Sequence, residues 1–243
     1  MFAEKNGLIK VSSRNLFGTQ FEKPNAKTIR RDRNAAGPNL FEREEILRIL
    51  NACDPQLKAM VLLGINGGLG NTDVAQLCKS RIDFTTGWLD YPRPKTEISR
   101  RIPLWPETLE VLQEWLPHRP KSTDPANAGL VFLTVKGNRW ARVNRSEDGK
   151  YTAIDALSAR FKKLLRSLDI NGRRSLGFYC LRHCFETYGG ESRDQVAVNA
   201  VMGHVDPSMA ANYRHRISDE RLHFVVNVVR DWLFGEQKEE AEK

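Results

Sequence analysis

An arginine, a histidine and a tyrosine follow one another in the carboxyl-terminal third of the chain, as Arg182, His204 and Tyr213. An arginine guanidinium can hold a phosphate through two hydrogen bonds, and a histidine can move a proton near neutral pH. A tyrosine hydroxyl can act as an oxygen nucleophile. Together these residue types indicate cleavage of a phosphodiester bond without a metal.

Each of the three residues also has an ordinary structural explanation when it is taken alone. Tyr213 can be a core tyrosine, and the charge of Arg182 within a helix can be met by a buried carboxylate as well as by a phosphate. His204 follows a helix end, where the helix dipole favours the protonated imidazole. The meaning of the set therefore depends on the surrounding sequence.

That surrounding sequence is distinctive. It reads LRHCFETY over Leu181–Tyr188 and MGHVDPSMAANYRH over Met202–His215. These stretches resemble the catalytic domain of the tyrosine recombinase family, also called the phage integrase family. The resemblance extends more weakly from Leu40 to Phe234 and implies a mainly α fold with a small antiparallel β-sheet (α+β).

The resemblance implies a role for each matching residue. Tyr213, nine residues after His204, matches the nucleophile that forms a covalent 3′-phosphotyrosine link with DNA. Arg182 matches the family's second arginine, and His204 matches the later histidine that contacts the scissile phosphate. Lys95, within YPRPKTEISRRIPL, matches the β-hairpin lysine that protonates the leaving 5′ oxygen.

Two positions depart from the family pattern. Gly70, in GGLGNTD, stands where the first arginine is usual, and Tyr179 stands where a histidine usually precedes the second arginine. Losing one charged donor to a transition state typically slows a reaction roughly a hundred- to a thousand-fold. Arg93 lies two residues before Lys95 and would share its face in an extended segment, so we hypothesise that Arg93 supplies the missing charge. Tyr179 is expected to donate a hydrogen bond to DNA.

No cofactor or metal is expected. GGLGN lacks the Gly-Lys-Ser/Thr ending of a P-loop and the full dinucleotide fingerprint, and no paired carboxylates suggest a magnesium nuclease site. The cysteines Cys53, Cys78, Cys180 and Cys184 form no disulfide framework and lack zinc-site spacing, which indicates a reducing compartment. With no apolar run long enough for a bilayer and no signal-peptide pattern, the sequence predicts a cytoplasmic protein without a membrane partner.

The charge balance favours an anionic partner. The 243-residue chain carries 38 Lys and Arg against 30 Asp and Glu, a net charge of +8, and nucleic acid is the commonest partner of so basic a protein. Residues 1–40, with eight basic and three acidic residues, are expected to form an extended basic arm or linker, with a disordered leader as the alternative. Residues 41–234 are the expected catalytic domain, and 235–243 are an expected polar tail.

Apolar periodicity and turn signals predict the elements that position these residues. Helices are expected from Phe41 to about 50 and over 56–65, 71–78, 106–116, 161–168, 178–187, 194–202, 206–213 and 219–234. Strands are expected over 81–84, 88–91, 100–104 and 130–135, and no element is expected over 136–151.

The leading prediction is an enzyme that cleaves and rejoins double-stranded DNA in site-specific recombination or integration, self-associating on DNA. The wording of the motifs favours a recombinase over the mechanistically similar type IB topoisomerase. An alternative is a catalytically impaired relative that only binds DNA, which the helix-turn-helix pattern of Asp194–Arg216 also fits. A third is a helical protein-interaction module without salt-dependent DNA affinity. Family members usually carry a DNA-clamping domain before the catalytic one, and about forty residues precede it here, so we expect weak and unselective DNA binding.

Overall fold

A computed structural model describes residues 24–145, 151–170, 173, 176–205, 208–209 and 216–235 of the chain. The chain divides into two compact units, Met1–Pro38 and Asn39–Lys243. The described part of the first unit contains helix α3 (Ala26–Ala36), whose first turn is capped by the Asn25 side chain accepting the Thr28 N–H at 2.8 Å. An extended arm was expected here. That expectation is wrong for α3. The Asn25 cap stabilises the start of the helix, although the apolar residues of this segment show little helical periodicity. The domain boundary expected at residue 40 and the polar tail stay predictions.

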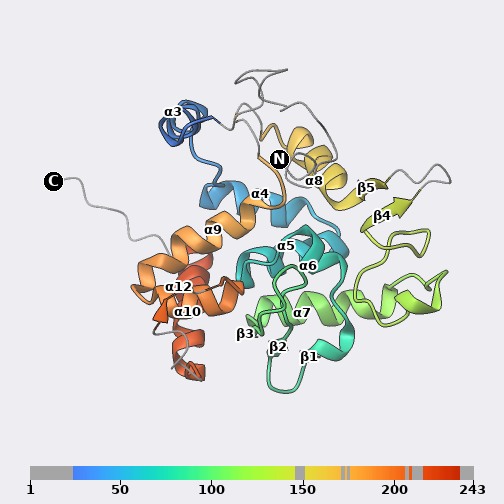
Figure 1. Ribbon diagram of the computed structural model, residues 1–243. Coiled ribbons are helices and arrows are strands. Elements are labelled where there is room, and N and C mark those ends of the chain that lie inside the picture. Colours follow the sequence, from blue (N-terminus) through green and yellow to red (C-terminus); the bar gives the residue numbers. More distant parts are fainter. Residues whose placement is uncertain are drawn as a thin grey trace, which may run out of the picture. The chain divides into compact units, whose positions relative to one another are not determined.

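The second unit is mainly helical with two small antiparallel sheets, which confirms the expected fold class (Figure 1). Its α-helices within the described residues are α4 (Arg43–Ala52), α5 (Pro55–Gly67), α6 (Asn71–Ala75), α7 (Pro106–Trp115), α8 (Ala156–Ser167), α9 (Cys180–Gly189), α10 (Gln195–Met202) and α12 (Asp219–Phe234). Short 3-10 helices cover Lys79–Arg81, Leu116–His118, Pro125–Asn127 and Gly190–Ser192. The expected helix over 206–213 lies outside the described residues.

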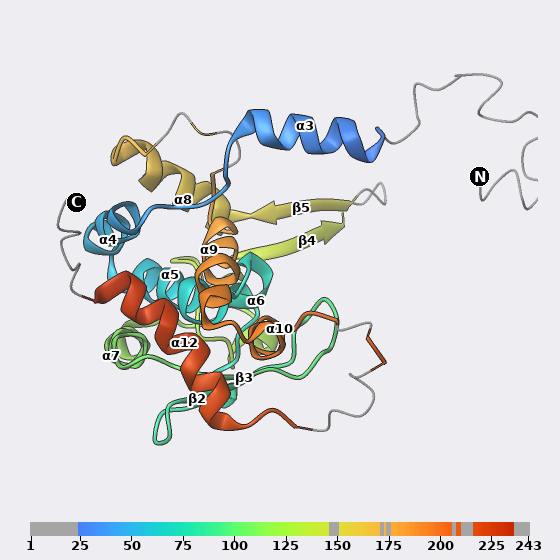
Figure 2. The ribbon, with the colours of Figure 1, turned by 90° about the vertical axis from the view of Figure 1, so that its left-hand side faces the viewer.

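Helix α5 forms the centre of the hydrophobic core. It starts at Pro55, is capped by Asp54, and is buried on nearly all sides, as its apolar sequence predicts. Helices α7 and α9 pack against it, and α12 packs against α9 (Figures 1 and 2). The approach of α9 is close, because a Cβ on Gly64 would lie 2.9 Å from the Leu181 side chain. This packing fixes the start of α9, where Arg182 lies.

The three-stranded sheet consists of β1 (Ile82–Asp83), β2 (Trp88–Asp90) and β3 (Arg101–Pro103), all antiparallel. The pairing continues past the strands, because the Tyr91 N–H donates to the Arg100 carbonyl at 3.0 Å. The Arg93 N–H likewise donates to the Ile98 carbonyl at 2.9 Å. The β2–β3 connection is therefore a long hairpin arm, here called the 91–100 arm.

Two strand expectations are corrected. Residues 130–135 form no strand, and only an isolated bridge joins Leu130 to Cys78, because no strand of the described residues pairs with the rest of this segment. Conversely, β4 (Ala141–Arg145) and β5 (Tyr151–Asp155) form a hairpin that begins in the polar stretch where no element was expected and continues past its end at residue 151. Backbone hydrogen bonds hold that hairpin together. Such pairing does not produce an apolar alternation in a polar sequence, so the sequence pattern did not predict it.

No helix in the described ranges is both long and apolar enough to cross a membrane.

Candidate functional site

The site is built around the turn that ends α10. Gly203 adopts a left-handed conformation with φ of 63°, and the His204 N–H donates to the Asn199 carbonyl at 2.9 Å. A Cβ at this position would lie 2.7 Å from Cδ of Arg100 and 3.1 Å from Cβ of Arg93. A glycine is therefore needed both for the backbone conformation and for the close approach of two arginines.

Arg182 lies in the first turn of α9 and is 1% exposed. Its Nη1 donates to the Gly68 carbonyl and its Nη2 to the Met202 carbonyl, the latter at 2.8 Å. These carbonyls lie at the ends of α5 and α10, where the helix dipoles are negative. Burial, and then the charge of Arg93, lower the pKa of Arg182 to about 10, so the guanidinium stays charged at neutral pH.

Arg93 turns inward from the 91–100 arm. Its Nη1 donates to the Gly203 carbonyl at 3.3 Å, and its buried Nε has no hydrogen-bond partner among the described residues. Lys95 is exposed in a turn that follows, because the Thr96 N–H donates to the Arg93 carbonyl at 3.1 Å. The expected extended segment with Arg93 and Lys95 on one face is thus wrong, although both residues line the same pocket.

Arg100 and Asp73 form a buried ion pair that sequence reasoning missed. Arg100 Nη1 lies 3.2 Å from Asp73 Oδ2, and the Arg100 side chain is fully buried. Asp73 Oδ2 also accepts the Gly70 N–H at 3.0 Å. In the sequence, Asp73 looked like an ordinary acid in the first turn of a helix. Two signals for the ion pair were available: Asp73 lies three residues after Gly70, and Arg100 lies two residues before the buried Ile102.

Three arginines thus gather at the Gly203 turn, and they affect one another. The charge of Arg93 lowers the pKa of both Arg100 and Arg182, in each case after the larger effect of burial. In the described part of the chain, Asp73 is the only carboxylate within 4 Å of these guanidinium groups. The cluster therefore carries excess positive charge and would favour an anion.

His204 is held by a polar cluster on α9 and α10. Its Nδ1 lies 3.4 Å from Asn199 Oδ1 and 3.5 Å from Glu186 Oε2. Gln195 Nε2 joins the two acceptors, donating to Glu186 Oε1 at 2.9 Å and to Asn199 Oδ1 at 3.1 Å. Two acceptors beside Nδ1 favour a proton on that nitrogen, which leaves Nε2 as a proton acceptor. None of these three supporting residues was identified from the sequence.

The protonation expected for His204 is corrected. Burial, followed by the charges of Arg182 and Arg93, lowers the pKa of His204 below its usual value, while Glu186 opposes the shift. The helix end favours the imidazolium, but burial and two nearby guanidinium groups outweigh it. The neutral imidazole is therefore the main form at neutral pH.

Gly70 and Tyr179, the two departures from the family pattern, are in contact. A Cβ on Gly70 would lie 3.1 Å from Cε2 of Tyr179, so the tyrosine ring occupies the space where a side chain at position 70 would begin. The ring also meets His183 edge-on, with centroids 5.3 Å apart, and Tyr179 remains 46% exposed. Tyr179 can still offer its hydroxyl to a ligand in the adjoining pocket.

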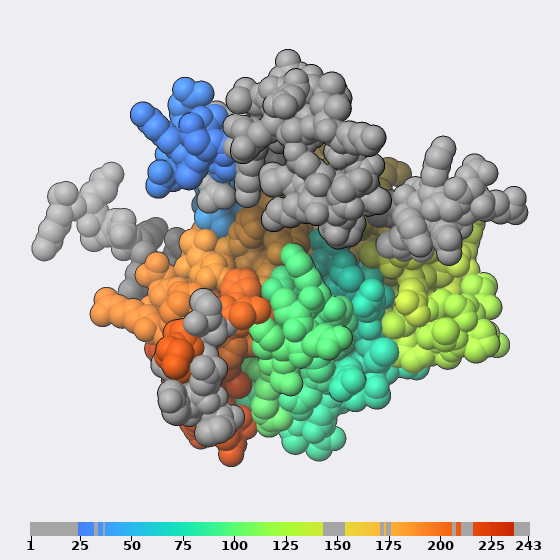
Figure 3. Space-filling view, in the orientation of Figure 1, coloured from blue at the N-terminus to red at the C-terminus, as the bar shows by residue number. Residues whose placement is uncertain are grey.

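Pockets lie on either side of the 91–100 arm. One, of about 800 Å³, is lined by Gly70, Asp73, Arg93, Lys95 and Tyr179 among others. The other, of about 670 Å³, is lined by residues that include Arg100, Arg101, His204, Arg216 and Asp219. Figure 3 shows the arm (green) between α10 (orange) and α6 (teal).

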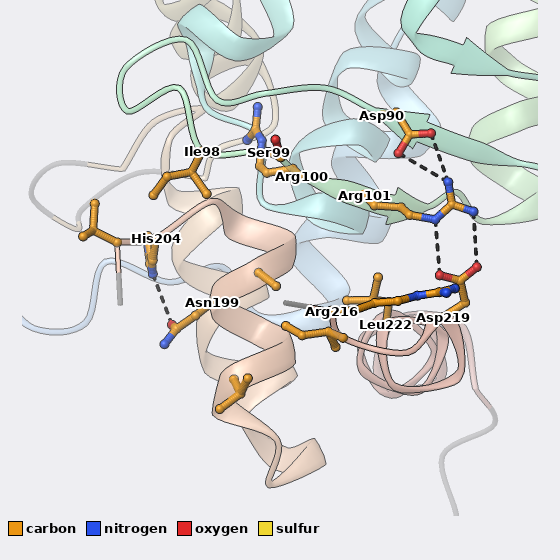
Figure 4. A pocket seen from close by; sticks show the side chains of 14 residues that line it. Asp90, Ile98, Ser99, Arg100, Arg101, Asn199, His204, Arg216, Asp219 and Leu222 are labelled. Atoms are coloured by element: carbon orange, nitrogen blue, oxygen red, sulfur yellow. Dashed lines mark hydrogen bonds and ion pairs between the residues drawn. The ribbon is translucent and has the colours of Figure 1, made fainter. Parts of the chain in front are cut away.

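The second pocket is bounded by an ion-pair cluster. Arg101 lies between Asp90 and Asp219, at 3.1 and 3.2 Å, and His204 lies beside Asn199 on the pocket wall (Figure 4). Asp219 is the first residue of α12, so the ion pair between Arg101 and Asp219 joins β3 to α12, the helix that follows Tyr213 in the sequence.

Tyr213 itself lies outside the described residues. The described residues contain no group of three or more His, Cys, Asp or Glu side chains that could hold a metal ion.

Comparison with known proteins agrees with this architecture. Residues 39–220 match the model of the phage integrase family. The chain belongs to that family, and its fold is that of a tyrosine recombinase catalytic domain. No curated protein matches the sequence.

Three solved structures illustrate the likeness. XerA recombinase is 17% identical with a TM-score of 0.56, over 76% of this chain and 63% of XerA. XerH site-specific recombinase, bound to palindromic difH substrate after cleavage, is 17% identical with a TM-score of 0.54, over 76% of this chain and 51% of XerH. The Tn1549 transposon integrase, in complex with a circular intermediate DNA, is 14% identical with a TM-score of 0.53, over 91% of this chain and 73% of that one. This chain thus spans less than two thirds of XerA and XerH.

Proposed function

We propose that this protein cleaves and rejoins double-stranded DNA in site-specific recombination or integration, through a covalent 3′-phosphotyrosine intermediate. The observation that carries the proposal is the gathering of Arg93, Arg100 and Arg182 beside His204, with Asp73 as their nearby carboxylate. Such a cluster suits a phosphodiester, whose transition state gains negative charge.

In this proposal Arg182 and Arg93 bind the nonbridging oxygens of the scissile phosphate. His204 Nε2 accepts the proton of the Tyr213 hydroxyl as the phenolic oxygen attacks phosphorus. The bond between phosphorus and the 5′ oxygen breaks, and Lys95 Nζ gives that oxygen a proton. The new phosphotyrosine bond keeps the bond energy, so a 5′ hydroxyl from another strand can reverse the step. Tyr179 would contribute a hydrogen bond to the DNA backbone.

Excess positive charge in the cluster also supports double-stranded DNA as the partner. Exchange between two DNA sites needs more than one active site, so we propose that the protein self-associates on DNA. The XerH structure holds a palindromic difH substrate and the Tn1549 integrase structure holds a circular intermediate DNA, which is consistent with this proposal.

The test is a nicked suicide duplex, with the substrate drawn from a pool of flanking genomic sequences. Wild type should give a slow-migrating covalent band on a denaturing gel, and Tyr213→Phe should give none. Tyr188→Phe is the matched control, because Tyr188 stacks on Trp232 with centroids 3.5 Å apart and is expected to leave the band unchanged.

DNA binding without a covalent band would favour the alternative of a relative that binds DNA but does not cleave it. The lack of an arginine at position 70, where the Tyr179 ring lies instead, is the observation that favours this second candidate. Absence of any salt-dependent DNA affinity would contradict both candidates and favour a protein-interaction module.

A further inference from the structure

Arg100 is a fully buried arginine whose hydrogen bonds are incomplete. Its Nε donates to the Tyr91 carbonyl at 3.0 Å and its Nη1 to Asp73 at 3.2 Å. Its Nη2 is buried and has no partner among the described residues. Desolvation lowers the pKa of Arg100 despite the attraction of Asp73, so this charge is held at an energetic cost.

We propose that Arg100 replaces the arginine that the family motif places at position 70. This inference rests on the proposed function. Arg100 does so through its ion pair with Asp73 and not by lining the pocket that holds Gly70 and Tyr179, so it is a positioning residue that acts through Arg182.

The contacts define how Arg100 reaches Arg182. Arg100 holds Asp73 Oδ2, which also accepts the N–H of Gly70. Two residues earlier, the carbonyl of Gly68 accepts a hydrogen bond from Arg182 Nη1. The ion pair thus anchors one end of a three-residue segment whose other end orients the guanidinium of Arg182.

The charges define what Arg100 contributes. Asp73 raises the pKa of Arg182, which shows that the carboxylate acts on that guanidinium. Arg100 holds that carboxylate through the ion pair of 3.2 Å. Loss of the pair would therefore change both the hydrogen bonding of the segment that orients Arg182 and the charge beside it.

The Gly70–Tyr179 contact explains why the replacement does not come from position 70. A side chain there would meet the tyrosine ring at 3.1 Å, so an arginine fits only if the ring moves. The 91–100 arm instead brings Arg100 to Asp73, and the lack of a side chain at Gly203 leaves room for it.

The test is a double-mutant cycle at Arg100 and Asp73. Arg100→Gln alone leaves a buried unpaired carboxylate and can fail to fold, whereas Arg100→Gln with Asp73→Asn removes both charges. Cooperative thermal unfolding checks that each variant is folded. The matched control is Arg230→Gln with Glu107→Gln, an ion pair at 2.5 Å between α12 and α7, away from the site.

The main measurement is the rate of covalent complex formation at saturating DNA. We expect the Arg100→Gln, Asp73→Asn double variant to be roughly 100-fold slower than wild type, because Arg182, a charge that acts in the transition state, is no longer held in position. Arg100→Lys, which keeps the charge, should be at least about tenfold faster than that double variant. A double variant as fast as wild type would mean that Arg100 only neutralises Asp73, and it would overturn the inference.

A second measurement separates this inference from the proposed function. If wild type forms no covalent band that depends on Tyr213, the proposed function fails. Equilibrium binding of the same duplex at low salt then decides the role of Arg100. About tenfold weaker binding by the folded double variant supports its contribution to phosphate binding, and unchanged affinity overturns it.

Discussion

At the scale of single residues, the site depends on how neighbouring charges set the protonation of His204. Arg182 and Arg93 oppose its protonation, whereas Glu186 favours it. Nδ1 faces Glu186 and Asn199, so the lone pair of Nε2 is available in the neutral form. An imidazole held neutral in this way is suited to accept a proton.

The lowered pKa of His204 predicts the acid limb of the pH profile. The neutral form is lost only as the pH falls through a pKa below 6.5, so the covalent-complex rate should hold down to that range and decline below it. Glu186→Gln removes the group that raises this pKa, and the limb should move to still lower pH. The rate is measured from about pH 5 to 8.

The control for this prediction is Glu191→Gln, which neutralises an exposed acid near the end of α9. It should leave the profile in place. A limb that moves to higher pH in Glu186→Gln, or does not move, would show that His204 is not the titrating group.

The chemical types at the site were predictable from sequence, but their contacts were not. Arg182, His204 and Arg93 lie together at the Gly203 turn. Their partners are carbonyls and side chains whose positions depend on the packing of α5, α9 and α10. For that reason Arg100 was not identified, since its partner lies 27 residues away.

At the scale of elements, a buried asparagine ties α5 to the β3–α7 junction. Asn66 Nδ2 donates to the Pro103 carbonyl at 3.0 Å, and its Oδ1 accepts from the Trp105 N–H at 2.9 Å and the Thr108 hydroxyl at 3.0 Å. The end of β3 is thereby fixed against the central helix. The position of the 91–100 arm depends on the same junction.

Replacing Asn66 by alanine should therefore destabilise the protein. Three buried polar groups would lose their partner, and the free energy of unfolding should fall by about 3 kcal/mol. Urea unfolding followed by circular dichroism measures the change. Asn51→Ala, at an exposed position of α4, should change stability by less than about 0.5 kcal/mol. A similar stability for both variants would contradict the role given to Asn66.

Periodicity identified the helices better than the strands. The stripe of α8 and the apolar surface of α5 are encoded locally, so both helices were expected; α5 lies within two residues of its expected bounds, whereas α8 begins five residues before its expected start. The β4–β5 hairpin was missed, and the strand expected over 130–135 is absent. Strand formation depends on a neighbour elsewhere in the chain, which a local pattern does not specify.

At the scale of the whole molecule, the net charge of +8 predicts salt-dependent DNA binding. The logarithm of the binding constant should fall linearly with the logarithm of salt concentration, with a slope set by the number of phosphates contacted. Arg93→Gln should reduce that slope by about one unit if Arg93 contacts a phosphate. Fluorescence anisotropy over a salt series measures the slopes.

Arg119→Gln is the control for this change in charge, because Arg119 is already bound to the carbonyls of Leu130, Asn127 and Ala128. Its slope should equal that of wild type. Equal slopes for wild type and Arg93→Gln would remove Arg93 from the phosphate contacts.

The sequence alone determined the residue types at the site, the family resemblance and the main helices, because motifs and helical periodicity are local properties. The tertiary structure decided which charges meet. It paired Arg100 with Asp73, turned Arg93 toward Gly203 and placed two guanidinium groups near His204. These outcomes depend on burial and on contacts between distant segments, because both shift the pKa of each charged group.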